Sequence, residues 1–316
     1  MRYTITSLFS GCGGLDLGFI GGFEYKGERF RRLPFDIVGA FDNDQKSVHT
    51  YANMIGDHIL MKDLATTNPS EIPPADILIG GFPCQDFSSC GPKRGLRSSR
   101  GRLYEVMVDY LSHHQPMTMI AENVRHLAKM HGGTVLKTIL EAIRQVGYRV
   151  EVWSLNAADF GVPQTRKRLF IVAVREDLPG FPAQPLSSHA DSPNSIEWAI
   201  RDLEKITDES IPNQSQYFLA STAKRGNGQG DEKSRRDLPG YTVRANAKSR
   251  IQFHYVLPRR LTVRECARLQ TFPDSFVFEH SATSNIMQIG NAVPPVLAYR
   301  VAQTVKRYLD SIHKNR

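Results

Sequence analysis

The sequence predicts an α/β protein in which a sheet with flanking helices is followed by a smaller, mostly irregular or β region. Two observations carry this prediction. Up to about Glu176, short apolar runs typical of strands alternate with segments of helical periodicity. Beyond Glu176 the alternation stops and prolines punctuate the chain, at positions 179, 182, 185, 193 and 212. In such a sheet, functional residues are expected at the carboxyl ends of the strands.

Composition narrows the class of protein. The 316 residues suit two lobes, and Lys and Arg exceed Asp and Glu by 40 to 32, which favours a polyanionic partner. The four cysteines, at positions 12, 84, 90 and 266, have neither disulfide nor zinc spacing, so we expect reduced thiols and no metal site. No signal peptide opens the chain and no apolar run approaches the roughly 20 residues that span a bilayer, which favours a cytoplasmic protein.

The first predicted strand, Tyr3 to Phe9, ends in a glycine-rich turn that includes Gly11 and Gly14, after which a helix begins. Such a turn lets the backbone approach a ligand closely, although plain loops and dinucleotide folds use similar turns. The basic stretch that follows, residues 24–35, is predicted to be a solvated loop rather than an extra phosphate contact.

The second predicted strand, Ile37 to Phe41, is followed by Asp42, and Asp63 lies in the next loop. An acid at the end of the second strand can accept both hydroxyls of a ribose. The alternative is a helix cap, for which Asp44 is better placed.

The third predicted strand, residues 76–80, breaks at two glycines into a loop that carries Cys84. A lone cysteine is by default a small buried hydrophobe. Here a Pro-Cys-Gln turn flanked by glycines and serines exposes the sulfur, so that its thiolate could act as a nucleophile. Residues 88–101 are rich in glycine and cations and poor in packing groups, which is typical of a lid loop.

Later elements bring further polar residues to the same edge. A strand over residues 117–121 is followed by Glu122 and Asn123, which would lie beside Cys84 in a parallel sheet. Arg166 and Arg168 alternate at the entry to a strand and would point the same way if extended. The other predicted elements are helices around 103–111 and 136–143 and strands over 148–155 and 169–174.

Six stretches, taken together, resemble the motifs of the DNA cytosine-5 methyltransferases of the bacterial restriction–modification type. Gly-Phe-Pro-Cys-Gln-x-Phe-Ser at residues 81–88 resembles that family's catalytic loop. The others follow in the family's order, at residues 9–14, 122–124, 164–168, 264–268 and 290–293. The resemblance implies a Rossmann-like, S-adenosylmethionine-dependent methyltransferase sheet with a smaller target-recognition domain.

The resemblance also implies residue roles. Cys84 would add covalently to C6 of a flipped-out cytosine in duplex DNA, with Glu122, Arg168 and Arg166 holding the base. S-adenosylmethionine would be converted to S-adenosylhomocysteine in a site formed by Phe9, Gly11, Gly14, Asp42, Asp63 and Asn291. Gln85 and Ser88 of the catalytic loop would contact DNA.

The region 178–258 concentrates positive charge where a DNA reader needs it. Its candidate DNA-binding residues are Arg225, Gln229, Lys233, Arg235, Arg236, Arg244 and Arg250. We therefore expect a catalytic and cofactor domain over 1–177, a target-recognition domain over 178–258, and C-terminal helices over 259–316. Thr262 and Glu265 form a capping box, and Leu297, Val301 and Val305 begin the apolar face of a last helix that returns to the catalytic domain.

Three alternatives remain open: an enzyme of the RNA-directed branch that methylates tRNA, a DNA-binding regulator that has lost catalysis, and a nicotinamide dehydrogenase. The Gln164–Arg168 stretch and the basic region argue against the first. The retained Cys84 and Glu122 argue against the second, and an incomplete dinucleotide fingerprint against the third. We expect a monomer acting on double-stranded DNA, bacterial and nucleoid-associated when bound, and paired in function with a restriction endonuclease.

Overall fold

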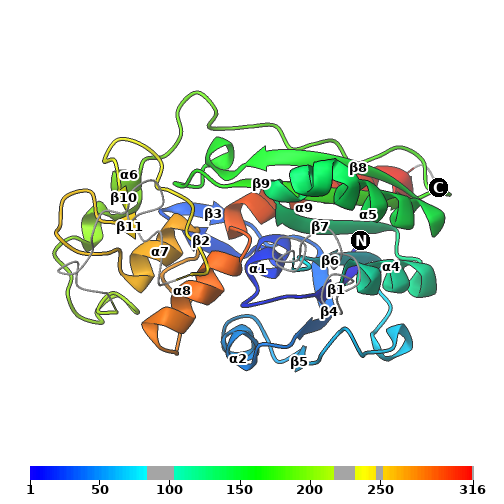
Figure 1. The fold of residues 1–316 in the computed structure, drawn as a ribbon, viewed down its shortest axis with the longest axis horizontal. Coiled ribbons are helices and arrows are strands. Elements are labelled where there is room, and N and C mark those ends of the chain that lie inside the picture. Colours follow the sequence, from blue (N-terminus) through cyan, green and yellow to red (C-terminus); the bar gives the residue numbers. More distant parts are fainter. Residues whose placement is uncertain (84–102, 217–231, 247–251, 315–316) are drawn as a thin grey trace.

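The computed structural model describes residues 1–83, 103–216, 232–246 and 252–314. Its centre is an open seven-stranded sheet of order β5-β4-β1-β6-β7-β9-β8 (Figure 1). The strands are β1 (Tyr3–Leu8), β4 (Phe35–Asp42), β5 (Ile59–Met61), β6 (Ile77–Gly80), β7 (Thr118–Val124), β8 (Tyr148–Asn156) and β9 (Lys167–Arg175). The first five in spatial order are parallel, whereas β9 is antiparallel to both of its neighbours. The predicted α/β class is confirmed.

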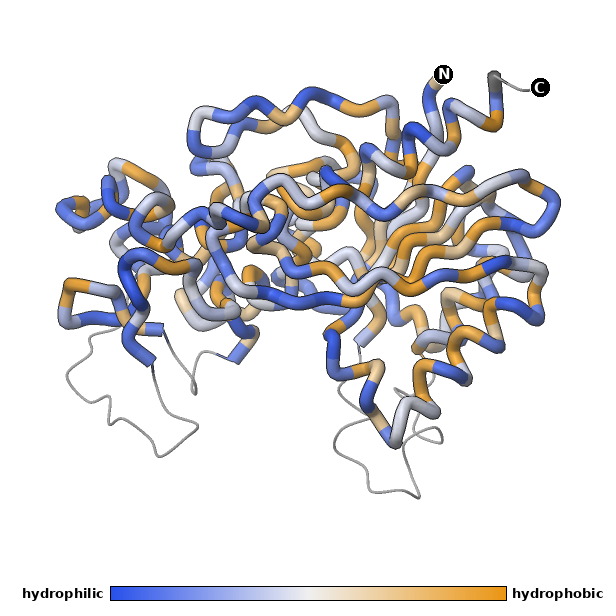
Figure 2. The backbone as a smooth tube through the Cα atoms, turned by 90° about the horizontal axis from the view of Figure 1, so that it is seen from above, coloured by the Kyte–Doolittle hydropathy of each residue, from blue (hydrophilic) through white to orange (hydrophobic). Residues whose placement is uncertain are grey.

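Helices cover both faces of this sheet. Helices α1 (Gly14–Ile20) and α9 (Pro295–Lys314) share one hydrophobic cluster with the sheet, and α4 (Leu103–His114) and α5 (Thr134–Gln145) share another. The period-2 alternation of β6 explains the division, because Ile77 and Ile79 lie in the first cluster and Leu78 in the second. Figure 2 shows the hydrophobic residues concentrated in the strands between these layers.

The helix ends follow from local sequence. Asp44 caps α2 (Gln45–Met54) by accepting a hydrogen bond from the Ser47 amide at 3.0 Å, as expected. The capping box of α7 (Val263–Leu269) is also present. The apolar face predicted for the last helix is buried against the first lobe, through Leu297, Val301, Val305, Tyr308 and Ile312. Helix α9 therefore packs against α1 and the sheet.

After β9 the chain forms a second lobe with little regular structure. Its described elements are α6 (Ile196–Ile200), the two-residue strands β10 (Glu232–Lys233) and β11 (Gln252–Phe253), α7 and α8 (Ala282–Asn291). Short 3₁₀ segments complete the described part, namely η1 (Pro69–Glu71), η2 (Arg125–Gly133), η3 (Ala157–Phe160) and η4 (Arg201–Leu203). Leu203, Leu269 and Phe272 of this lobe belong to a further hydrophobic cluster, which also includes Cys12 of the first lobe.

The basic stretch of residues 24–35 differs from the predicted solvated loop. It contributes to a hairpin of β2 (Phe23–Tyr25) and β3 (Glu28–Phe30), whose Phe23 and Phe30 rings stack with centroids 4.7 Å apart. Phe30 packs edge-on against Tyr299 of α9. The aromatic residues are spaced to face one side of the hairpin, and their burial outweighs the charged composition.

The helices of the described ranges include none with the length and apolar character that a membrane span requires.

Candidate active site at the carboxyl edge of the sheet

Glu122 and Arg168 form an ion pair at the end of the sheet. The Arg168 Nε lies 2.8 Å from Glu122 Oε1, and the two side chains are 11% and 10% exposed. The antiparallel register of β7 and β9 creates this pair, because Val124 lies opposite Arg168 and Glu122 opposite Phe170. A carboxylate and a guanidinium are thus paired with little exposure to solvent. They lie at the edge of the sheet just beyond Gly80, the last residue of β6.

The pair lies directly beside the start of the predicted catalytic loop. The Asn123 side-chain amide donates a hydrogen bond to the Phe82 carbonyl at 2.9 Å. A Cβ placed on Gly81 would lie 3.5 Å from Glu122 Oε2. Pro83 is the last residue described before the gap, so Cys84, Gln85 and Ser88 lie outside the described residues. Strand β6, which precedes the loop of Cys84 in the sequence, and strand β7, which carries Glu122, are adjacent and parallel, as expected.

Asp42, the last residue of β4, connects this strand to the glycine turn after β1. One carboxylate oxygen accepts a hydrogen bond from the Gly11 amide at 2.8 Å, and the other accepts one from the Asp44 amide at 2.9 Å. Burial raises the pKa of Asp42, while these backbone donors act in the opposite direction. Both Phe9 and Gly11 have positive φ, 57° and 55°, and no atom lies within 4 Å of a Cβ placed on Gly11. The turn therefore leaves open space beside an oriented carboxylate.

The remaining cofactor candidates surround this turn. Asp63 is exposed and follows Lys62, whose amide donates to the Asp42 carbonyl at 3.0 Å. Asn291 is exposed at the end of α8. Gly14 is packed so closely that a Cβ there would lie 2.4 Å from the Val293 carbonyl oxygen. The glycine turn and the 290–293 motif therefore meet, although nearly 280 positions separate them in the sequence.

A buried carboxylate supports the turn from behind and has no counterpart among the predicted site residues. Asp16 of α1 accepts hydrogen bonds from the Ser7 hydroxyl at 3.1 Å and from the Tyr51 hydroxyl at 2.9 Å. Burial raises the pKa of Asp16 to about 6. The sequence signal that could have identified Asp16 is a single acidic residue in an otherwise apolar helix directly after a glycine turn.

Arg166 and Arg168 make different hydrogen bonds and ion pairs, although the charges of both Arg168 and Glu122 act on the Arg166 guanidinium. Arg166 is buried and donates to the carbonyls of Val243, Gly290 and Ala292 at 2.9–3.0 Å. Its burial lowers the pKa of the guanidinium. Arg166 directly precedes β9, which begins at Lys167.

Gln164, like Arg166, forms hydrogen bonds that connect the two lobes. It is fully buried, donates to the Leu269 carbonyl at 2.9 Å and accepts from the Val243 amide at 2.8 Å. The Gln164–Arg168 stretch thus uses its first and third residues to hold segment 240–243 and its fifth to reach Glu122.

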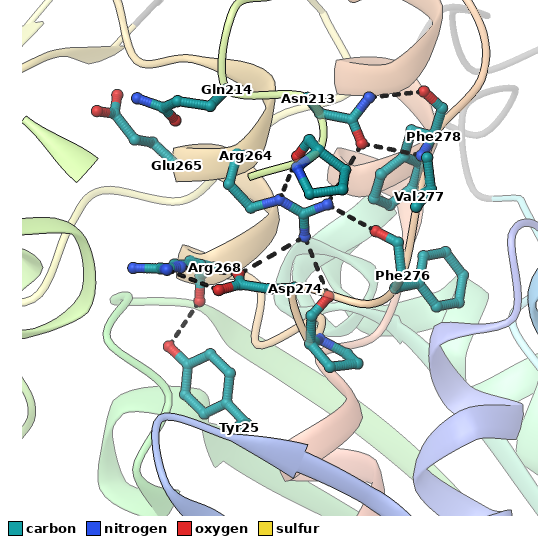
Figure 3. Close-up of polar contacts among 12 residues, drawn as sticks. Tyr25, Asn213, Gln214, Arg264, Glu265, Arg268, Asp274, Phe276, Val277 and Phe278 are labelled. Carbon is teal, nitrogen blue, oxygen red and sulfur yellow. Dashed lines mark hydrogen bonds and ion pairs between the residues drawn. The ribbon is translucent and has the colours of Figure 1, made fainter. Parts of the chain in front are cut away.

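Arg264 and Arg268 organise the second lobe in a comparable way (Figure 3). Arg264 is buried and donates to the carbonyls of Pro212, Pro273 and Phe276 at 2.7–3.0 Å. Burial lowers its pKa to about 10. Arg268 pairs with Asp202 and Asp274, and its carbonyl accepts a hydrogen bond from Tyr25 of the β2–β3 hairpin at 2.7 Å. The structural role expected for this helix agrees with these contacts.

The described cations of the second lobe differ in their surroundings. Lys233 and Arg235 are exposed, Arg236 pairs with Glu197, and Arg244 is exposed near the segment held by Arg166. Arg225, Gln229 and Arg250 lie outside the described residues.

The sheet order, the turn after β1 and the carboxylate after β4 define a Rossmann-like methyltransferase of the S-adenosylmethionine-dependent class. Within that class, the chain belongs to the C-5 cytosine-specific DNA methylase family, whose model matches residues 3–307. It is therefore a DNA cytosine-5 methyltransferase.

Curated relatives match over almost their whole length. Type II methyltransferase M.MthTI of Methanothermobacter thermautotrophicus is 33% identical over 99% of both chains, and M.NgoPII of Neisseria gonorrhoeae is 33% identical over 97% of this chain and 96% of its own. Among solved structures, S. pombe Dnmt2 methyltransferase has a TM-score of 0.71 at 18% identity, covering 97% of this chain and 99% of its own, which supports the fold.

Proposed function

We propose that this enzyme transfers a methyl group from S-adenosylmethionine to C5 of a cytosine in a short, specific sequence of duplex DNA. The observation that supports the proposal is the Glu122–Arg168 ion pair, which is largely excluded from solvent. It lies beside Gly81 and Phe82, the residues that lead into the loop of Cys84. Because the reacting carbon lies inside the base stack, the target nucleotide has to be flipped out, at a cost of a few kcal/mol.

Cys84 is the proposed nucleophile. Its thiolate adds to C6, and the ring electrons then make C5 nucleophilic enough to take the methyl group. A base removes the proton from C5, the C5–C6 double bond forms again, and the thiolate leaves. S-adenosylmethionine, when bound, supplies the electrophilic methyl group.

Glu122 and Arg168 stabilise the charge that develops during addition. Glu122, either protonated or sharing a proton with the base, hydrogen-bonds N3 of the cytosine, and Arg168 donates to O2. Arg166 was also a candidate for this role. Its three carbonyl acceptors favour a supporting role instead, in which it positions Arg168 by fixing the strand entry.

The cofactor site is proposed around the glycine turn. Asp42 keeps acceptor capacity for ribose hydroxyls, because a carboxylate offers about four lone-pair sites and two backbone donors are bound. Half-buried Phe9 offers a ring for the adenine, and exposed Asp63 an acceptor for its amino group. Asn291 approaches the same site with Gly11 and Gly14 because residues 292 and 293 pack on Gly14.

The proposed division of labour follows the chain. Residues 1–177 supply chemistry and cofactor binding, residues 178–258 read the DNA target, and residues 259–316 close the molecule. The names of the relatives as type II methyltransferases support a role in modification, alongside a restriction endonuclease that cuts the same sequence. One protomer bound to one duplex is the simplest arrangement.

Trapping on a modified duplex tests the proposal. With 5-fluorocytosine at the target, the fluorine cannot leave as a proton, so the covalent complex should persist through denaturing electrophoresis. Cys84→Ser should abolish the complex, whereas Cys90→Ser should retain it. Complex formation by Cys84→Ser at the wild-type level would contradict the assignment. Methylation of tRNA but not DNA would favour the RNA-directed alternative.

A further inference from the structure

The segment η2 leaves the active-site edge directly after Glu122 and Asn123. Its inner side is set by Leu127 and Met130, which are buried in the core and lie one 3₁₀ turn apart. The outer positions, Arg125, His126, Lys129 and His131, are all exposed. None of the nine residues of η2 is acidic. A surface carrying only positive or protonatable side chains therefore adjoins the catalytic pair.

A third cation joins this surface from the neighbouring strand. Val124 lies opposite Arg168 at the end of the β7–β9 ladder, and the next residue outward on each chain is Arg125 and Lys167, respectively. Both are exposed. The ladder itself ends at Val124 and Arg168, so Arg125 and Lys167 flank its end.

The three cations also lack the carboxylate partners that some other surface cations have. Lys26 pairs with Asp202, Lys62 with Glu71 and Lys306 with Asp310. Within the described part of the chain, no carboxylate lies within ion-pair distance of Arg125, Lys129 or Lys167. We call Arg125, Lys129 and Lys167 the basic rim.

We propose that the basic rim binds backbone phosphates of the DNA strand that carries the target cytosine. The inference rests on the proposed function. A flipped nucleotide stays attached to its strand, so the phosphates flanking it lie at the mouth of the pocket that holds its base. Arg125 directly follows Val124, which lies opposite Arg168, and Lys167 directly precedes Arg168, so the backbones of both cations adjoin the Glu122–Arg168 pair. Phosphate contacts of this kind fix register and orientation without reading sequence.

Salt-dependent binding tests the proposal, using the full-length chain and duplexes with and without the target. Arg125→Ala and Lys167→Ala should each reduce the slope of log K against log salt by about one unit, equally on both duplexes. Arg125→Lys should keep the slope. The double variant Arg125→Ala/Lys167→Ala should lose about two units on both duplexes.

Lys137→Ala is the matched control, because Lys137 is exposed on α5 only eight residues beyond Lys129 but pairs with Glu141. Its slope should equal that of wild type. An unchanged slope in the double variant would overturn the proposal, as would slopes that fall on the target duplex alone. Either result would leave the proposed function standing if wild type methylates DNA at C5. Failure of that methylation, by contrast, would overturn the proposed function.

Discussion

At the scale of single residues, Asp42 combines two duties. It holds the glycine turn through the Gly11 amide and keeps further acceptor capacity toward the open space beside that turn. Asp42→Ala should weaken binding of S-adenosylmethionine by about 1.5–3 kcal/mol, roughly ten- to a hundred-fold, because an acceptor with charge is lost. Titration calorimetry measures this change directly.

Asp44→Ala provides the matched control for Asp42. Its carboxylate caps α2, so the variant should lose about 1 kcal/mol of stability while its affinity for S-adenosylmethionine is retained. An unchanged dissociation constant in Asp42→Ala would mean that Asp42 only braces the turn.

Residue chemistry was predictable from the sequence, but residue contacts were only partly so. Glu122 was expected at the end of a strand, and its motif marked it as functional. Its contact with Arg168, however, depends on the antiparallel placement of β9 beside β7. No local pattern encodes that register. The carbonyl partners of Arg166 likewise come from distant segments, so the sequence around Arg166 could not reveal them.

At the scale of elements, the turn after β11 contains a buried histidine. His254 is fully buried, and its Nδ1 accepts hydrogen bonds from the amides of Val256 and Leu257 at 3.1 and 3.2 Å. Protonation would remove this acceptor. Burial lowers the pKa of His254, an effect larger than the opposing one of Glu265, whose carboxylate is already bound by Arg259.

The pH dependence of stability follows from this lowered pKa. Below about pH 6.5 the unfolded chain binds a proton at His254 that the folded chain does not bind. The free energy of unfolding therefore decreases as the pH is lowered from about 6.5 to the folded-state pKa of His254. The slope contributed is at most about 1.4 kcal/mol per pH unit. Urea unfolding of wild type and His254→Asn from pH 5 to 8 measures it. Asparagine keeps an acceptor near Nδ1 and does not titrate, so parallel curves would exclude His254 as the cause.

The β2–β3 hairpin shows where element prediction failed. Charge density suggested a solvated loop, yet Phe23, Tyr25 and Phe30 are all buried. Their spacing was the missed signal. It could not be interpreted alone, because the surfaces that cover the hairpin come from α9 and from Arg268, far along the chain.

At the scale of the whole molecule, the two lobes are expected to separate chemistry from target choice. Alanine variants of Lys233, Arg235, Arg236 and Arg244 should divide into two groups when binding is measured on target and random duplexes across salt. Loss of a base contact should cost about 1–3 kcal/mol on the target alone. Loss of a phosphate contact should weaken both and lower the salt slope by about one unit.

Arg29→Ala serves as the control, because Arg29 lies in the first-lobe hairpin and pairs with Glu24. It should change neither preference nor slope. If no second-lobe variant alters target preference while first-lobe variants do, the proposed division is wrong. Arg225, Gln229 and Arg250 belong in the same series.

The α/β architecture of the first lobe was predictable, because apolar strand runs alternate with segments of helical periodicity up to β8. The second lobe was not, since it is held by buried arginines bonded to carbonyls rather than by repeating secondary structure. Such contacts depend on the path of the whole chain. The family motifs marked Arg264 and Arg166, but periodicity gave no partner for either.

The contact between Gly14 and Val293, with α9 packed along α1, has a consequence during protein synthesis. The first turn of the nascent chain leaves the ribosome long before the segment that covers it. The proposed methyl donor site includes both, so it is incomplete until translation reaches residues 292–312. Prematurely terminated copies should therefore neither bind S-adenosylmethionine tightly nor methylate DNA.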